Sequence, residues 1–320
     1  MSKSEAFANR LRKNARHWDK WARRQGLSCY RIYDRDLHEF PLAIDRYTAH
    51  IHLQEYATDW AAGEAEYQAW REDCFRVVES VLELPRDHIH FKQRRRQRGP
   101  EQYEKTGRSG EDFVVEEQGL KFWVNLDAYL DTGLFLDHRN TRRMVRERAA
   151  GRRFLNLFAY TGSFSVYAAA GGAPASTTVD MSNTYQDWTR RNFELNGLDL
   201  QAHRLVRADV FQFLEDAGRT RAQYDLIVMD PPSFSNSKRM EGVLDVQRDH
   251  VPLIEGCLRL LAPGGELFFS NNRRGFRLDA AALAGCDIRD IRDISRQTVP
   301  EDFSNKKIHQ CWIIRHGAQP

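Results

Sequence analysis

The second half of the chain repeats one order of elements, in which an apolar strand is followed by a short loop and a helix. Strands are predicted at 154–158, 177–179, 204–207, 224–229 and 266–270. Helices are predicted between them at 163–170, 184–195, 210–216 and 246–261. Strands that alternate with helices pair in parallel, and the helices cover both faces of the sheet. The pattern therefore predicts an α/β fold with a doubly wound, Rossmann-like sheet, whose ligands bind beyond the carboxyl ends of the strands.

The first 150 residues mix helices with short strands and predict a smaller α+β subdomain. A helix that ends near residue 84 is stopped by Pro85, and residues 113–126 form two strands around the turn Gln118-Gly119. A basic helix over about 141–149 precedes Gly151. A chain of 320 residues is long enough for two moderate domains. We expect one domain over residues 1–150 and a second over residues 151–320.

Basic residues are concentrated in two short segments, although the net charge is only +3. Residues 10–24 hold seven Lys or Arg against one Asp and have helical spacing. Residues 92–108 hold seven against two Glu, and the arginine run at 94–98 with Gly99-Pro100 is predicted as an exposed loop between strands around 88–92 and 112–116. Such segments favour an RNA partner, and a merely solvated surface is the alternative for each. Cations also follow the fourth and fifth predicted strands. The candidate RNA contacts are Arg10, Arg12, Arg94, Arg95, Arg96, Arg98, Lys238, Arg273 and Arg274.

The cysteines, histidines and apolar runs exclude several other classes of protein. Five scattered cysteines contain no C-x-x-C pair, which fits free thiols in a reducing cytoplasm. The histidines have no metal-like spacing, so we expect no metal. Residues 154–179 carry no charge, but their Gly, Pro, Ser and Asn residues argue against a membrane helix. No apolar run follows the basic N-terminus, so we expect no signal peptide and a cytoplasmic protein.

Polar residues follow the first four predicted strands. The first strand runs into N-L-F-A-Y-T-G, in which Gly162 opens a helix. After the second strand, Asp180 can accept hydrogen bonds from both hydroxyls of a ribose, and after the third, Asp209 can accept one from an adenine amine. Each aspartate is alternatively a helix cap. The fourth strand ends in D-P-P-S-F, from Asp230 to Phe234.

The glycine patterns decide which nucleotide ligand fits this edge of the sheet. The first loop lacks the first two glycines of G-x-G-x-x-G, and the chain has no G-x-x-x-x-G-K-[ST]. Both motifs bind pyrophosphate or triphosphate groups. The sequence therefore favours a nucleoside without a pyrophosphate, such as S-adenosyl-L-methionine.

Several longer motifs carry a family resemblance. The segments NLFAYTGSFSVYAAAGGA, TTVDMSNTYQDWTRRNFELNGL, DPPSFSNSKRM, DVQRDH and FSNNRRGF resemble class I methyltransferases of large-subunit ribosomal RNA. They are most similar to the RlmK-like guanine-N7 methyltransferases, which form the C-terminal half of the fused RlmKL enzymes. The basic opening segment and DTGLFLDHR match that half as well. The resemblance implies S-adenosyl-L-methionine as cofactor and 23S ribosomal RNA, or a large-subunit precursor, as partner. The upstream guanine-N2 half of the fused enzymes is not in this sequence, so we do not expect that second activity, and whether the site preference is unchanged stays open.

The resemblance also implies which residues bind the cofactor. Asp180 would hold the ribose and Asp209 the adenine, while Phe135 and Arg139 would approach from the N-terminal side. A local ion pair of Arg139 with Asp137 or Glu147 is the alternative. The full set of implied cofactor contacts is Phe135, Arg139, Asn156, Phe158, Tyr160, Thr161, Gly162, Asp180 and Asp209.

The chemistry expected at the target follows from the acceptor atom. Guanine N7 bears no proton at neutral pH, so in-line transfer needs neither a general base nor a covalent intermediate, and orientation supplies most of the catalysis. Asp230, Pro231 and Pro232 are expected to shape the pocket and Phe234 to stack on the guanine, unless Phe234 is a core aromatic. Pyrimidine C5 methylation needs a cysteine nucleophile, and residues 269–272 read F-S-N-N.

Two alternatives remain open at this stage. An exocyclic amine, guanine N2 or adenine N6, can also be the methyl acceptor beside D-P-P-S-F. A non-catalytic RNA-binding assembly factor is the alternative from another class of function.

Overall fold

The computed structural model describes residues 2–56, 63–94, 110–129, 131–235 and 243–317. The chain forms two compact units, one of Met1–Thr132 with Glu301–Asn305 and one of Gly133–Pro300 with Lys306–Pro320. The division falls earlier in the chain than the expected 150/151. The reason is that the basic helix α3 (Arg139–Arg148) belongs to the second unit, where its Val145 packs with Phe154 and Phe164 in one apolar cluster.

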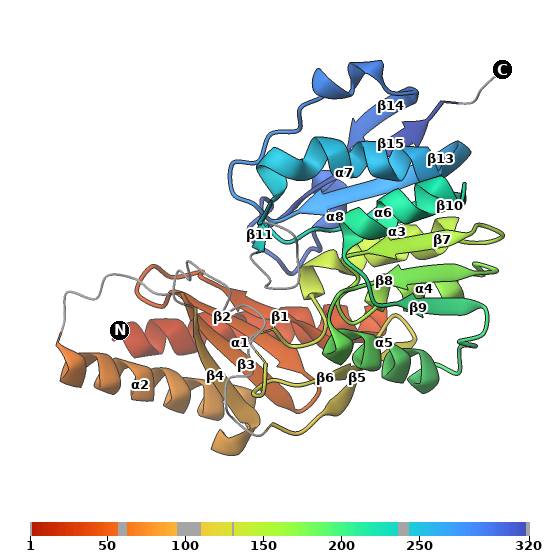
Figure 1. The fold of residues 1–320 in the computed structure, drawn as a ribbon. Coiled ribbons are helices and arrows are strands. Elements are labelled where there is room, and N and C mark those ends of the chain that lie inside the picture. Colours follow the sequence, from red (N-terminus) through yellow and green to blue (C-terminus); the bar gives the residue numbers. More distant parts are fainter. Residues whose placement is uncertain (1, 57–62, 95–109, 130, 236–242, 318–320) are drawn as a thin grey trace. The chain divides into compact units, whose positions relative to one another are not determined.

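The first unit is built on a four-stranded sheet covered by two helices (Figure 1). The strands lie in the order β1 (Cys29–Asp34), β2 (Leu42–Tyr47), β3 (His50–Tyr56) and β4 (Ile89–Arg94), and only β3 and β4 pair in parallel. The helices are α1 (Lys3–Gln25) and α2 (Glu64–Leu82), followed by the 3-10 turn η1 (Arg86–His88). The predicted hairpin is confirmed as β5 (Phe113–Glu117) and β6 (Leu120–Val124). This unit is therefore an α+β structure, as expected.

Helix α1 is amphipathic, as its spacing predicts. Phe7 and Leu11 are fully buried against the sheet, and Trp18 and Trp21 are half-buried beside them. The helix begins with a capping box between Ser2 and Glu5. Its outer surface keeps a row of exposed cations: Arg10, Arg12, Lys13, Arg16, Lys20, Arg23 and Arg24.

A segment from near the end of the chain completes the first unit. The backbone N–H of Arg31 donates to the buried Asp302 at 2.9 Å, and the Arg31 guanidinium lies 4.3 Å from the ring centroid of Phe303. The hydroxyl of Ser304 donates to Asp34 at 2.6 Å. Residues 301–305 are thus part of this core, although the sequence pattern assigns them to the other domain.

The second unit contains a seven-stranded sheet in the order β14-β15-β13-β10-β7-β8-β9 (Figure 1). All five predicted strands are confirmed, and the sheet is doubly wound as expected. These five strands pair in parallel, as expected, whereas the sequence did not predict β14 and β15, and β15 runs antiparallel to both β13 and β14. The strands are β7 (Phe154–Leu157), β8 (Ser176–Val179), β9 (His203–Val206), β10 (Tyr224–Met229), β13 (Leu261–Asn271), β14 (Ile288–Asp293) and β15 (Gln310–His316).

Helices cover both faces because side chains alternate along each strand. Leu155 and Leu157 of β7 face one apolar cluster with α6 (Val210–Arg219) and α7 (Val246–Leu260), whereas Phe154 faces the other cluster with α3 and α4 (Ser163–Ala170). The remaining elements are α5 (Asn183–Leu195), α8 (Ser295–Thr298), the 3-10 turns η3 (Leu136–His138) and η4 (Ala282–Gly285), and the short strands β11 (Phe234–Ser235) and β12 (Leu244–Asp245). Within the described ranges, no helix is long and apolar enough to cross a membrane.

Candidate active site

Three aspartates lie in loops at the same edge of the second unit's sheet. Asp180 follows β8, Asp209 lies in the loop after β9, and Asp230 follows β10. These strands are parallel, so their carboxyl ends meet at one edge. Because β7 lies between β8 and β10, the loop that follows β7 stands between Asp180 and Asp230.

The loop after β7 has an unusual backbone. Phe158 and Tyr160 adopt left-handed conformations, with φ of 56° and 52°, and Gly162 follows with φ of 72°. Left-handed non-glycine residues cost about 1–3 kcal/mol each and cluster at functional sites. A Cβ atom on Gly162 would lie 2.4 Å from Cγ2 of Thr189 on α5. The structure therefore requires Gly162 for the close contact between α4 and α5, whereas the family resemblance implied a contact with the cofactor.

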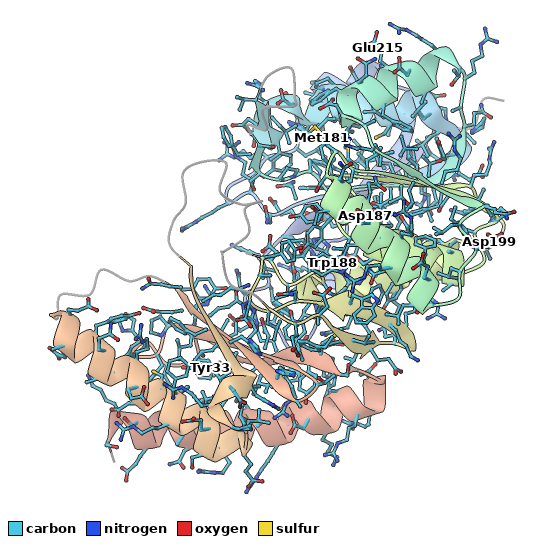
Figure 2. All side chains as sticks on the ribbon, turned by 60° about the horizontal axis from the view of Figure 1, so that its bottom comes forward. Tyr33, Met181, Asp187, Trp188, Asp199 and Glu215 are labelled. Atoms are coloured by element: carbon cyan, nitrogen blue, oxygen red, sulfur yellow. The ribbon has the colours of Figure 1, made fainter. Side chains whose placement is uncertain are left out.

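Tyr160 connects this loop to the segment before α3. Its hydroxyl accepts a hydrogen bond from the backbone N–H of Gly133 at 2.9 Å, and its ring centroid lies 5.0 Å from that of Phe135. Phe135 is 37% exposed, and Phe158 and Tyr160 are half-buried. Gly133 has φ of 97°, and Trp188 of α5 (Figure 2) fills the space that a Cβ atom there would need. Phe135 and Tyr160 thus form a partly accessible aromatic wall next to the backbone that donates to Asp180, and Phe158 lies in the same loop, half-buried against the apolar cluster of α6 and α7.

Three residues predicted to line the cofactor site lie inside the protein. Asn156 is 1% exposed and donates to Ser165 of α4 at 3.0 Å. Thr161 is fully buried and donates to the carbonyl of Gly133 at 2.6 Å. Arg139 begins α3 and is 1% exposed. Asn156 and Thr161 therefore fix the loop from behind, and the sequence could not separate this role from ligand contact.

Asp180 has a desolvated carboxylate. Its two oxygens accept hydrogen bonds from the backbone N–H groups of Tyr160 and Ser182, both at 2.9 Å. Burial nevertheless raises the pKa of Asp180 to about 6. A carboxylate has about four lone-pair sites, so further acceptor capacity remains for hydroxyl donors.

Asp209 caps helix α6, which is the alternative role that the sequence left open for the strand-end aspartates. Its Oδ1 accepts from the backbone N–H groups of Phe211 and Gln212 at the start of α6. Its Oδ2 takes part in no hydrogen bond with another described residue. One oxygen therefore caps the helix, and the other is available to a ligand.

Asp230 and Phe234 lie on either side of the two prolines. Oδ1 of Asp230 accepts a hydrogen bond from the Ser270 hydroxyl at 2.7 Å, and its Oδ2 lies 3.5 Å from Nε2 of His138. Pro231 is buried and Pro232 is half-buried. Phe234 is 46% exposed, so it is not a core aromatic. The D-P-P-S-F segment thus presents a carboxylate and an open aromatic face at the edge of the sheet.

Sequence reasoning missed a cluster of histidines behind Asp230. The chain brings together His138, Asp137 and His309, although His309 lies 172 residues after Asp137. The His138 and His309 rings are stacked, with centroids 4.2 Å apart and planes 11° apart. An imidazole binds a metal along the lone pair in its ring plane, and two stacked parallel rings cannot share one ion in this way. The cluster therefore suits hydrogen bonding better than a metal.

The candidate RNA-binding side chains differ in whether another residue of the protein already pairs with them. Arg273 forms an ion pair with Asp245 of β12, whereas Arg274 is exposed and pairs with no residue that the structure describes. On α1, Arg10 lies 4.0 Å from Asp36 and Arg12 donates to Asn9. Arg94 is the last residue of β4. Arg95, Arg96, Arg98 and Lys238 lie outside the described residues.

Comparison with known proteins identifies the family. Residues 77–285 match the family described as S-adenosylmethionine-dependent methyltransferase. Ribosomal RNA large subunit methyltransferase K of Neisseria meningitidis serogroup B is 59% identical over 312 residues, which cover 98% of this chain and 87% of that protein. The chain belongs to the ribosomal RNA large subunit methyltransferase K family. Its methyl donor is S-adenosylmethionine.

Another relative and a similar solved structure are methyltransferases as well. Ribosomal RNA large subunit methyltransferase K/L of Methylococcus capsulatus is 53% identical over 315 residues, which cover 97% of this chain but 42% of that protein. The structure titled SMU.776, a methyltransferase complexed with SAH, superposes with a TM-score of 0.79 and 26% identity, covering 98% of this chain and 82% of that one. The Rossmann-like fold and the cofactor class are therefore confirmed.

The donor and acceptor groups at the carboxyl edge fit the nucleoside of this methyltransferase's cofactor. The hydroxyls of a ribose are hydrogen-bond donors, and Asp180 offers a desolvated carboxylate that backbone groups satisfy only in part. An adenine amine is also a donor, and the free oxygen of Asp209 is an acceptor. Aromatic side chains at 135 and 160 offer apolar contact beside them.

Replacement of Gly162 by alanine tests the close contact in this loop. We expect Gly162→Ala to lower the free energy of unfolding by roughly 2–4 kcal/mol, because backbone strain and the clash with Thr189 add. Gly197→Ala is the matched control, since Gly197 has φ of 63° and no atom within 4 Å of the added Cβ. Urea denaturation measures both. Equal losses of unfolding free energy in the two variants would show that the contact with Thr189 is unimportant. Adding Thr189→Ser to Gly162→Ala should restore part of the lost stability, because serine lacks the Cγ2 atom that clashes.

Proposed function

We propose that this methyltransferase modifies N7 of a guanine in 23S ribosomal RNA. The names of its relatives support a large-subunit ribosomal RNA target, and the resemblance to the RlmK-like enzymes supports N7. The observation that carries the proposal is the open aromatic face of Phe234, which stands 46% exposed in the segment that begins with Asp230. An exposed phenyl ring at this edge is suited to stack on a base that has left the RNA.

The cofactor contacts that we propose are a subset of those expected from the sequence. Asp180 holds the ribose hydroxyls and Asp209 the adenine amine, while Phe135, Phe158 and Tyr160 supply the apolar wall. Asn156, Thr161 and Gly162 support this wall from inside. Arg139 is buried at the start of α3 and is not among the proposed contacts, whereas Arg142 of the same helix donates to the Phe135 carbonyl at 2.9 Å and supports that segment.

Asp230 and its neighbours provide the chemistry at the base. S-adenosylmethionine, when bound, supplies a methyl group on a positively charged sulfur. Methylation at N7 leaves a positive charge on the guanine, and the fixed Asp230 carboxylate stabilises that charge as it develops. Pro231 and Pro232 hold the backbone at that point, so the protein contributes orientation and electrostatics without accepting a proton.

The RNA backbone is bound, in this proposal, by exposed cations. On the first unit, Asn9, Arg12, Lys13, Arg16 and His17 lie together on one exposed face of α1. On the second unit, Arg274 is exposed near the end of β13. Arg273 is paired with Asp245 and is assigned to the structure of the β11–β12 segment.

Guanine N2 is the second candidate acceptor. A proton must leave an exocyclic amine when it is methylated, and Asp230 is a carboxylate that can accept an N–H hydrogen bond. The partly exposed carboxylate of Asp230 favours this candidate, because it keeps acceptor capacity for the N–H hydrogen bond and for the proton that leaves.

Mass spectrometry of ribosomal RNA nucleosides tests the function directly. In a strain without the gene, we expect 7-methylguanosine in 23S RNA to fall by one residue per molecule, and the gene to restore it. Loss of N2-methylguanosine would favour the second candidate. No change in any methylated nucleoside, together with no binding of S-adenosylhomocysteine, would favour a non-catalytic RNA-binding role.

Cofactor affinity should depend on the ionisation of Asp180. Below pH 6 the carboxylate takes up a proton and loses acceptor capacity, so the affinity for S-adenosylhomocysteine should fall by roughly tenfold per pH unit. Above about pH 7 it should be constant. Calorimetric titration between pH 5 and 8 measures this dependence.

Two variants serve as references for this titration. Asp180→Asn should bind more weakly at pH 8 and should not depend on pH. Asp187→Asn, at an exposed position of α5 (Figure 2), should behave like the unmodified protein. A flat curve for the unmodified protein would remove Asp180 from the cofactor site.

Replacement of Phe234 tests the stacking role. Stacking of a base on an aromatic ring is worth about 1–3 kcal/mol, so Phe234→Ala should lower kcat/KM for RNA by roughly 5–150-fold. Affinity for S-adenosylhomocysteine should not change. Phe234→Tyr keeps the aromatic face and should retain most of the activity. Equal losses of turnover and cofactor affinity would contradict the assignment.

A further inference from the structure

We propose that His138 is a positioning residue that holds the Asp230 carboxylate in the orientation needed for methyl transfer. The inference rests on the proposed function, in which Asp230 faces the target base. The sequence does not connect His138 with Asp230, because His138 lies in DTGLFLDHR and Asp230 begins D-P-P-S-F, far along the chain. The structure brings the two side chains into contact within the second unit.

The two oxygens of Asp230 face two different elements. Ser270 of β13 donates to Oδ1 at 2.7 Å, and Nε2 of His138, at the end of η3, lies 3.5 Å from Oδ2. A carboxylate with one fixed oxygen can still turn about its last side-chain bond. Contact at both oxygens restricts that rotation and fixes the direction in which the remaining lone pairs point.

The surroundings of His138 indicate which nitrogen carries its proton. The side chain is buried, and its Nδ1 has no hydrogen-bond partner among the described residues. Nε2 lies 3.5 Å from Asp230 and 3.9 Å from Asp137. Two carboxylates beside one nitrogen favour an N–H at that nitrogen, so the neutral ring carries its proton on Nε2 and directs it at Asp230.

The charged groups around His138 act in opposite directions. Asp230 and Asp137 favour the protonated imidazole, whereas burial, His309 and Arg142 oppose it. Burial is the largest effect, and the pKa of His138 lies below its usual value. A neutral His138 can support the Asp230 carboxylate without neutralising its charge.

His309 fixes the ring plane of His138. The two rings are stacked with centroids 4.2 Å apart, and the edge of Phe164 contacts His138 at a centroid distance of 5.8 Å. His309 is itself held at both nitrogens, by Asp137 at 3.0 Å and by Thr298 at 2.9 Å. The imidazole beside Asp230 therefore has little freedom to turn away from it.

Single-turnover methyl transfer with saturating S-adenosylmethionine and ribosomal RNA lacking the modification tests this role. His138→Leu removes the N–H, whereas His138→Gln keeps an amide N–H near the position of Nε2. We expect the first to lower the rate by about tenfold or more and the second by only a few-fold, since small errors of position are costly in catalysis. Affinity for S-adenosylhomocysteine should stay unchanged in both.

His203→Leu is the matched control and should keep the full rate. His203 is also a buried histidine, but it is hydrogen-bonded to Ser176 at the amino ends of β8 and β9.

A double-mutant cycle with Asp230→Asn distinguishes positioning from packing. If His138 acts through Asp230, adding His138→Leu to Asp230→Asn should cause no further loss of rate. Additive losses would overturn the proposal, and so would equal losses in the Leu and Gln variants.

The nitrogen shifts of His138 provide a readout that does not depend on activity. In ¹⁵N NMR spectra we expect a neutral ring protonated at Nε2, with a shift that changes in Asp230→Asn. An unchanged shift would overturn the proposal even if the Leu variant fails to fold. An unmodified protein without activity on ribosomal RNA would instead refute the proposed function, while the NMR result would still decide whether His138 holds Asp230.

Discussion

Parallel pairing of β7 with β8 on one side and β10 on the other positions Asp180, Asp230 and the loop between them. The register places Asn156 opposite Thr178 and Val228, so the three strands end together. Asn156 and Thr178 both donate to the buried Ser165 hydroxyl of α4, at 3.0 and 2.7 Å. This buried polar contact ties the helix that follows the loop to the strands that precede it. The aspartates after β8 and β10 consequently lie on either side of one short, strained loop.

The strained loop is stabilised by its neighbours. The hydroxyl of Tyr160 and that of Thr161 bind the N–H and the carbonyl of Gly133, and Asn192 of α5 donates to the Thr161 carbonyl. Asp180 accepts from the Tyr160 N–H. These contacts come from three separate segments, which explains how two left-handed non-glycine residues can persist in one turn. They also hold the aromatic wall in place before a ligand binds.

The two aspartates beside the loop have different electrostatic settings. Asp180 is desolvated, so its carboxylate is costly in the free protein, and donors on a ligand would offset that cost. Asp230 accepts a hydrogen bond from a serine hydroxyl, and its other oxygen lies 3.5 Å from a buried imidazole. In the proposed function, the first carboxylate binds hydroxyl donors and the second faces a base on which positive charge develops.

The sequence by itself determined the family, the order of the five parallel strands and their helices, and the edge of the sheet at which the strand-end aspartates gather, because alternating strands and helices leave few ways to fold. It did not determine β14 and β15, because the charged alternation I-R-D-I-R-D of β14 reads equally well as surface loop and because no local signal shows that β15 reverses direction. Nor did it separate Asn156 and Thr161, which face inward, from Tyr160, which borders the site, since these residues are close together in one motif.

The tertiary structure alone decided the contact between Asp230 and His138, the stacking of His138 on His309, and the place of residues 301–305 in the first unit. The physical reason is that these contacts join segments far apart in sequence, and their geometry depends on how complete elements pack.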